Sequence, residues 1–155
     1  MKFNQETLAM KKLHFIFIMS VLVWGCDKSE QYAVTARIDG VEWISKGAVP
    51  AILTANGLLI NASNPTQSPI AISIDDLVYN VIGSHPIDST NNAFLYGSSI
   101  TTGYFAKPSN PGALNITEVD ASEKRVKGTF ELMTYSLAGD SVHVTDGTFN
   151  IVYQN

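Results

Sequence analysis

An alternation of apolar and polar residues in short runs is the feature that most constrains the fold of this chain of 155 residues. From residue 32 onward, apolar side chains recur at every second position, as in Val34, Ala36 and Ile38. A period of two places one face of a strand against a core and the other face in solvent. No stretch after Cys26 shows the sustained period of about 3.6 residues that an amphipathic helix requires. The sequence therefore predicts an all-β domain.

Glycine, asparagine and proline divide these runs. Primed two-residue turns, which need positive φ, are expected at Asp39-Gly40, Asn56-Gly57 and Asp146-Gly147. Strands are expected beside these turns and also at residues 70–75, 77–82, 93–96, 100–106, 113–119 and 126–135, with loops at residues 64–69, 84–92 and 107–112. About eight to ten short strands joined in this way predict an antiparallel β-sandwich, with a closed calycin-like β-barrel as the alternative. We expect one domain over residues 32–155, with Trp43 as a core anchor.

The N-terminal segment predicts export. Met10-Lys11-Lys12 precedes a mostly apolar run, residues 13–25, which is shorter than the about 20 residues of a membrane-spanning helix. The run ends in Val23-Trp24-Gly25-Cys26, in which Val23 and Gly25 match the lipobox of bacterial lipoproteins and Trp24 is bulkier than the usual middle residue. We therefore expect residues 1–25 to be a signal peptide, with Met10 as an alternative start to Met1, and residues 26–31 to be a lipid-carrying cysteine and its tether.

Lipidation at Cys26, the only cysteine, would place the protein on a membrane. The lipid would be a diacylglyceryl group on the sulfur and an acyl group such as palmitate on the freed amine. Each CH2 of these chains that enters the membrane contributes about 0.8 kcal/mol of binding free energy, so that together the chains anchor the domain stably. We expect an exported protein anchored to the bacterial cell envelope, in the outer membrane. The formal net charge of −4 and the restriction of basic clustering to Lys124-Arg125-Lys127 exclude a nucleic-acid partner.

Several motifs together resemble an uncharacterised family of small Gram-negative, Bacteroidetes-type lipoproteins. They are the lipobox, Ile38-Asp39-Gly40-Val41-Glu42-Trp43, Ile116-Thr117-Glu118-Val119-Asp120, Lys127-Gly128-Thr129-Phe130-Glu131 and Val144-Thr145-Asp146-Gly147-Thr148-Phe149. The resemblance implies an all-β domain of unknown function. It brings no catalytic residue, cofactor or ligand with it.

No spacing predicts a metal or cofactor site. His85 and His143 lack a second ligand at the distance typical of zinc sites. Two acidic sets could be imagined as a divalent-cation site: the loop group Asp75, Asp76, His85 and Asp88, and Asp120 by itself. Neither has the alternating pattern of a calcium loop, and positions at strand ends and turns explain these residues more simply. We expect neither a metal nor a cofactor.

Catalytic motifs are equally weak. Gly97-Ser98-Ser99-Ile100 lacks the closing glycine of a nucleophile elbow. His143, between Val142 and Val144, is expected to face solvent, and it could serve as a base only if a serine and a carboxylate converged on it. Carboxylates that a glycosidase could use are Glu118, Asp120, Glu123 and Glu131, although turn charges explain them adequately. We expect no enzyme, with a hydrolase as the third functional class.

Aromatic residues of the irregular middle segment are the remaining candidates for a ligand surface. They are Tyr79, Phe94, Tyr96, Tyr104 and Phe105. Core filling is favoured for them, because aromatic side chains dominate β cores, but loops on a rigid scaffold also carry function. The favoured function is a binding or adhesion module for a glycan, a peptide or an envelope partner. The alternative is a structural accessory subunit of an outer-membrane assembly.

Replacing Cys26 tests the anchor. The Cys26→Ala protein is expected to remain an unprocessed precursor or to be released from the membrane, because alanine has no sulfur to carry the lipid. Metabolic labelling with palmitate should mark the wild-type protein and not the variant. A labelled Cys26→Ala protein would contradict the lipoprotein hypothesis.

Overall fold

The computed structural model describes residues 33–75, 79–90, 92–99 and 101–155. Cys26, the predicted signal peptide and the tether lie outside these residues. The described part of the chain is all-β, as predicted, and contains no helix that is long and apolar enough to cross a membrane. Its strands are β1 (Ala33–Ile38), β2 (Val41–Ile44), β3 (Ala51–Thr54), β4 (Gly57–Asn64), β5 (Gln67–Asp75), β6 (Gly83–Ile87), β7 (Ala93–Tyr96), β8 (Tyr104–Phe105), β9 (Gly112–Asp120), β10 (Arg125–Tyr135) and β11 (Ser141–Val152).

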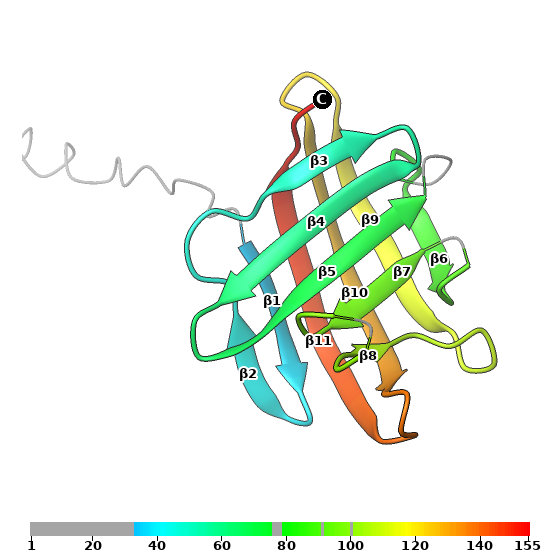
Figure 1. Cartoon of the computed structure of the whole chain (residues 1–155). Coiled ribbons are helices and arrows are strands. Elements are labelled where there is room, and N and C mark those ends of the chain that lie inside the picture. Colours follow the sequence, from blue (N-terminus) through cyan, green and yellow to red (C-terminus); the bar gives the residue numbers. More distant parts are fainter. Residues whose placement is uncertain (1–32, 76–78, 91, 100) are drawn as a thin grey trace, which may run out of the picture. The chain divides into compact units, whose positions relative to one another are not determined.

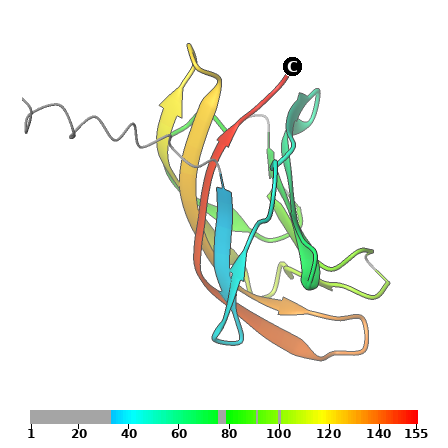
Figure 2. The same cartoon turned by 90° about the vertical axis from the view of Figure 1, so that its left-hand side faces the viewer.

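All the strands belong to one antiparallel sheet that curls so that its two halves face each other (Figures 1 and 2). One layer contains β3, β4, β5 and β7, and the other contains β2, β1, β11, β10, β9 and β6. β8 pairs with both β7 and β10 and so connects the layers. The fold thus combines the two packed layers of the predicted sandwich with the continuous hydrogen bonding of the alternative barrel.

A second connection between the layers joins β3 to the segment after β11. The Leu53 N–H donates to the Gln154 carbonyl at 2.7 Å, and the Gln154 N–H donates to the Ala51 carbonyl at 2.9 Å. Trp43 of β2 adds a side-chain link, because its indole N–H donates to the Ser68 carbonyl of β5 at 2.9 Å. The curled sheet is therefore held together at both of its margins.

The core lies between the layers and is built from the inward positions of the alternating runs. Ile70, Ile72 and Ile74 of β5 are buried, as the alternation predicts, and they face the other layer. Trp43 is fully buried, which confirms it as a core anchor. Each large apolar side chain that is fully buried contributes about 1.5–3 kcal/mol relative to an exposed one.

The first predicted turn is confirmed and the second is displaced by one residue. Asp39 and Gly40, with φ of +50° and +80°, connect β1 to β2. Between β3 and β4 the turn residues are Ala55 and Asn56, while Gly57 already belongs to β4 and pairs with Thr54. The Thr54 hydroxyl accepts a hydrogen bond from the Asn56 N–H at 3.2 Å, and Gly57 takes the positive φ of +118°.

The third predicted turn is wrong, because the chain does not reverse at Asp146-Gly147. β11 continues through both residues, and its pairing with β1 and with β10 shifts there by one residue. Asp146 has φ of +50°. This is a β-bulge, in which an extra residue bends a strand and increases its twist. A bulge and a primed turn both favour Asp-Gly, so the dipeptide alone did not distinguish them.

Two copies of Gly-Thr-Phe meet in antiparallel register beside this bulge. Gly128 pairs with Phe149, and Phe130 pairs with Gly147. A Cβ on Gly128 would lie 2.4 Å from the ring of Phe149, and a Cβ on Gly147 would lie 2.5 Å from the ring of Phe130. Each phenyl ring therefore occupies the space that the opposite glycine leaves open. Aromatic rings over glycine are a known way to fix the register of a curved sheet.

The middle of the chain differs most from expectation. Residues 84–92 are not one loop, because His85 and Pro86 lie in β6, which pairs with β9. Pro86 is tolerated because β6 is an edge strand, where a missing N–H costs no ladder hydrogen bond. Residues 79–82 form a turn and bend rather than part of a strand, and residues 77 and 78 lie outside the described residues.

Two further predicted boundaries were wrong. The predicted loop at residues 64–69 is a turn at Pro65 and Thr66, because the Asn64 side-chain oxygen accepts a hydrogen bond from the Thr66 N–H at 2.9 Å. The predicted strand at residues 100–106 is reduced to β8.

Substitution of Gly128 tests the glycine–phenyl pairing. The Gly128→Ala protein is expected to lose about 1–3 kcal/mol of unfolding free energy, the usual cost of overpacking a core position. Thr129→Val, which changes the exposed neighbour on the same strand, should stay within about 0.5 kcal/mol of the wild type. Urea denaturation measures both. Equal stability of Gly128→Ala and wild type would show that the ring of Phe149 does not fill this space.

Candidate functional site

The layer formed by β3, β4, β5 and β7 carries apolar side chains on both faces, although Asn61, Ser73 and Asp75 also lie on the outer one. Its inward side chains form the core, whereas Leu59 of β4, Ala71 of β5 and Leu95 of β7 point to the opposite face. The uncovered face of an antiparallel sheet is normally polar. An apolar outer face is therefore the feature of this domain that most needs a functional explanation.

A groove of about 430 Å³ lies on this outer face. Cross-strand pairing sets Ala71 beside Leu95 and Leu95 beside Phe105, which makes one continuous apolar row. Leu137, from the turn between β10 and β11, also lines the groove and is 68% exposed. The complete lining is Leu59, Ala71, Ser73, Ser89, Ala93, Phe94, Leu95, Thr101, Phe105 and Leu137. It contains no charged residue, and its volume falls within the about 300–1,000 Å³ of small-molecule sites.

The structure divides the five aromatic residues predicted as a ligand surface. Phe94 borders the groove but is only 2% exposed, and its ring packs on Phe130 in the core with the ring centroids 5.6 Å apart. Phe105 lines the groove. The other three, Tyr79, Tyr96 and Tyr104, are half-buried against the core. Tyr96 packs on Tyr104, and Tyr79 packs on Tyr153. Burial and, second, the neighbouring Tyr79 raise the pKa of the Tyr153 hydroxyl. Only Phe105 is thus placed as a groove side chain.

Sequence reasoning missed the aliphatic residues that make up half of the groove lining. The available signal was the unbroken apolar character of Leu58-Leu59-Ile60 and Phe94-Leu95-Tyr96, in which the position between two inward residues is also apolar. Such runs indicate a strand that is covered on both faces. Strands are predicted at these runs, but an apolar outer face is not.

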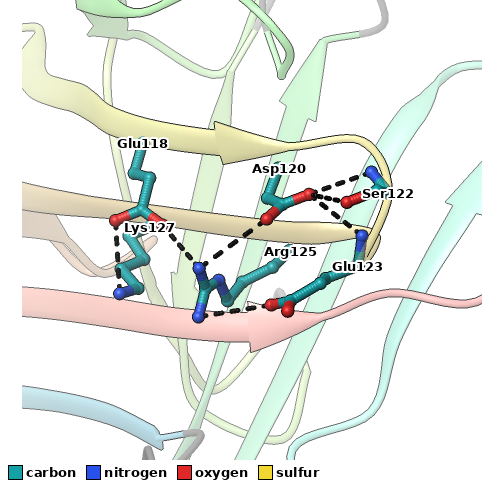
Figure 3. A network of polar contacts seen from close by, with 6 residues as sticks. All are labelled: Glu118, Asp120, Ser122, Glu123, Arg125 and Lys127. Carbon is teal, nitrogen blue, oxygen red and sulfur yellow. Dashed lines mark hydrogen bonds and ion pairs between the residues drawn. The ribbon is translucent and has the colours of Figure 1, made fainter.

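A charged cluster occupies the β9–β10 hairpin (Figure 3). Arg125, whose side chain is 15% exposed, donates to Glu118 at 2.7 Å and lies 3.5 Å from the Glu123 carboxylate and 3.9 Å from that of Asp120. Lys127 lies 3.2 Å from the other Glu118 oxygen. Three of the four carboxylates considered for a glycosidase thus surround one guanidinium, whereas Glu131 lies beside His143, and this arrangement fits a structural ion-pair network.

Asp120 is held ionised by its own turn. One carboxylate oxygen accepts from the Ser122 hydroxyl at 2.6 Å, from the Ser122 N–H at 2.9 Å and from the Glu123 N–H at 3.0 Å. The Ser122 hydroxyl, then the Glu123 N–H and, more weakly, the charge of Arg125 lower the pKa of Asp120. A carboxyl with a lowered pKa carries no proton at neutral pH, so Asp120 does not suit a general acid.

His143 faces solvent, as predicted. Its ring lies 3.7 Å from the Glu131 carboxylate, and its backbone N–H donates to the Asp39 side chain at 2.8 Å. In the part of the chain that the structure describes, no hydrogen bond joins this ring to a serine, and no three His, Cys, Asp or Glu residues are grouped to hold a metal ion. His85 contacts the Val81 carbonyl at 2.9 Å, and Asp76 lies outside the described residues.

A second hollow, also of about 430 Å³, lies over β9, β10 and β11 and is mixed in character. Its two carboxylates already have partners, since Asp146 lies 3.3 Å from Arg37 and Glu131 lies beside His143. The groove over β4, β5 and β7 is the more distinctive candidate, because apolar surface left uncovered is the less usual feature.

The turn at Asp120 predicts a pH dependence. Because the pKa of Asp120 is lower in the folded protein than the ordinary 3.8, its ionised form stabilises the fold above that pH, and this contribution is lost as the pH falls through the folded-state pKa. Ser122→Ala should raise the pKa of Asp120, as measured by NMR titration of its carboxyl carbon. Glu123→Gln, which keeps the backbone N–H, should change it less. An unchanged pKa in Ser122→Ala would contradict the assigned cause.

Comparison with known proteins identifies a family and no annotated relative. Searches of curated proteins and of solved structures found no match. A family model described as a domain of unknown function, DUF6252, matches residues 30–152. The match spans all the strands of the described domain, from β1 to β11. The chain therefore belongs to the DUF6252 family, an uncharacterised family with a domain of unknown function.

Proposed function

We propose that this protein is a lipid-anchored, non-enzymatic binding module of the bacterial cell envelope, and that the groove over β4, β5 and β7 is its binding surface. One observation carries the proposal: a groove of about 430 Å³ whose lining has no charged residue lies on the outer face of the sheet. Covering apolar surface is favourable by about 25 cal/mol per Å². A ligand that shields Leu59, Leu95 and Phe105 from water is therefore stabilised without any specific polar contact.

The lining also selects among the expected ligands. A glycan exposes hydroxyl groups that need hydrogen-bond partners when they leave water. The groove offers the hydroxyls of Ser73, Ser89 and Thr101, and that of Ser89 already donates to the Ala106 carbonyl at 2.7 Å. No amide or charged side chain lines it. The apolar part of a smaller molecule, a peptide or an envelope partner fits this surface better than a glycan does.

The N-terminal sequence supports the proposed location. Residues 13–25 and Cys26 have the composition of a lipoprotein signal and its acylated cysteine. The tether, residues 26–31, would span at most about 20 Å when fully extended. An anchor at Cys26 would thus keep the domain close to the membrane surface, with the outer membrane as the proposed site.

A structural accessory role is the second candidate. The observation that favours it is the 68% exposure of Leu137 beside the groove, since exposed apolar patches also mark protein–protein contacts. Under this alternative, a larger envelope protein co-purifies with the wild-type protein from detergent extracts. Under the leading proposal, the purified domain binds a small apolar ligand alone.

Blocking the groove tests the leading proposal. The wild-type domain is expected to bind the uncharged fluorescent dye phenylnaphthylamine, and Ala71→Trp should weaken binding at least about tenfold, since losing about 55 Å² of apolar contact corresponds to about 1.4 kcal/mol. Ala113→Trp, at an exposed alanine of β9 outside the groove, is the matched control and should bind normally. Equal dye binding by the two variants would show that the groove is not the binding surface.

A further inference from the structure

We infer that the groove accepts a single hydrocarbon chain that ends in an anionic group, as in a fatty acid, with Lys107 as the residue that binds the anionic end. This inference rests on the proposed function and adds the chemical class of the ligand. Two independent observations support it: the hydrogen-bonded state of the groove floor and the position of the nearest cation.

The floor of the groove favours a chain without polar groups. β5 is paired with β4 on one side and with β7 on the other, and β7 is paired with β5 and β8. Their backbone N–H and carbonyl groups are therefore engaged within the sheet. A peptide lying across this floor would bury N–H and carbonyl groups that find few partners there, which weakens binding. A hydrocarbon chain has no such groups.

The strands of the groove layer contain no lysine or arginine, and Lys107 follows β8, which connects this layer to the other. Between Lys46 and Lys124, Lys107 is the only lysine or arginine in the sequence, and β3, β4, β5, β7 and β8 all lie in that interval. Lys107 follows Phe105 by two residues, and Phe105 both lines the groove and pairs with Tyr135. The Lys107 ammonium lies 4.5 Å from the centre of the Tyr135 ring. Lys107 is thus placed next to the Phe105 end of the groove.

The surroundings of Lys107 leave its charge accessible to a ligand. The Tyr135 hydroxyl accepts a hydrogen bond from the Asn110 side chain at 2.8 Å, which helps to fix the ring beneath the ammonium. Among the residues that the structure describes, no ion pair joins Lys107 to a carboxylate. A cation–π contact stabilises an ammonium without neutralising it.

Two acidic residues are close in the chain to residues of the lining. Asp88 precedes Ser89, and Asp140 follows Leu137 by three residues. The Asp88 carboxylate accepts a hydrogen bond from the Thr90 N–H at 2.8 Å. Both residues lie towards the same end as Lys107, because the Ser89 hydroxyl donates to the Ala106 carbonyl at 2.7 Å and the Ser136 N–H donates to the Asp140 carbonyl at 2.8 Å. The anionic end is assigned to Lys107 by the positive charge of its ammonium beside Tyr135, and the hydrocarbon chain is assigned to the row of Phe105, Leu95 and Ala71.

Two ligands that differ only in charge test the assignment. Dodecanoate and dodecanol carry the same chain, and each is titrated against the phenylnaphthylamine complex of the wild-type domain. Dodecanoate should displace the dye at an about two- to fivefold lower concentration, which is the contribution of a partly exposed ion pair. The difference should shrink in high salt, because salt screens such a pair.

Three variants locate the cation. Lys107→Gln should remove the preference for dodecanoate and leave displacement by dodecanol unchanged. Lys107→Arg should retain the preference, since arginine keeps the charge. Lys46→Gln, which removes an exposed lysine elsewhere, should also retain it. Thermal melting of each variant verifies that the fold is intact.

Each outcome separates this inference from the proposed function. If the dye binds and Ala71→Trp blocks it, but dodecanoate and dodecanol compete equally or Lys107→Gln retains the preference, the anionic ligand class is wrong and the binding surface stands. If the dye does not bind, or Ala71→Trp has no effect, the binding surface itself is wrong. Two further results would also overturn the fatty-acid assignment: an apolar peptide that displaces the dye better than dodecanoate does, or a concentration-dependent dimer that Ala71→Trp abolishes.

Discussion

The curvature of the sheet depends on the contact between two glycines and two phenyl rings in the centre of β10 and β11. Phe149 fills the space over Gly128, and Phe130 fills the space over Gly147. The bulge at Asp146 adds the local bend. A flat sheet with these strands would expose both faces to water and could not enclose a core. Bending in the middle of the longest strands allows one continuous sheet to act as both layers.

The outer faces of the two layers differ in character. Alternation along β4, β5 and β7 already supplies the core through Ile60, Ile72 and Phe94. The outward positions of the same strands are thus not needed for folding, yet several of them are aliphatic. The opposite layer carries ion pairs on its outer face, such as that between Arg125 and Glu118. This difference between the two outer faces is the observation on which the proposed binding role rests.

The sequence predicted correctly those features that depend only on neighbouring residues, such as which face of a strand is buried. The alternation of Ile70, Ile72 and Ile74 gave the buried face of β5 correctly, because the period of a strand depends on the backbone alone. Whether Asp146-Gly147 turns the chain or bulges within it depends on the strands on either side, which the dipeptide does not reveal. The groove could not be predicted from the sequence for the same reason. Phe105 and Leu137 meet the outer face of β5 only through pairing between strands that are distant in the sequence.

The pairing of the first strand with the last has a kinetic consequence. β1 is hydrogen bonded to β11, where Ala33 faces Asn150, and β3 is joined to Gln154. Contacts between such distant parts of a chain form slowly, in about milliseconds to seconds for β-rich domains. The sheet cannot close before β11 and Gln154 have been synthesised. A sheet that stays open until β11 has been made is suited to passage through a membrane in the unfolded state, which is the route that the proposed signal peptide would require.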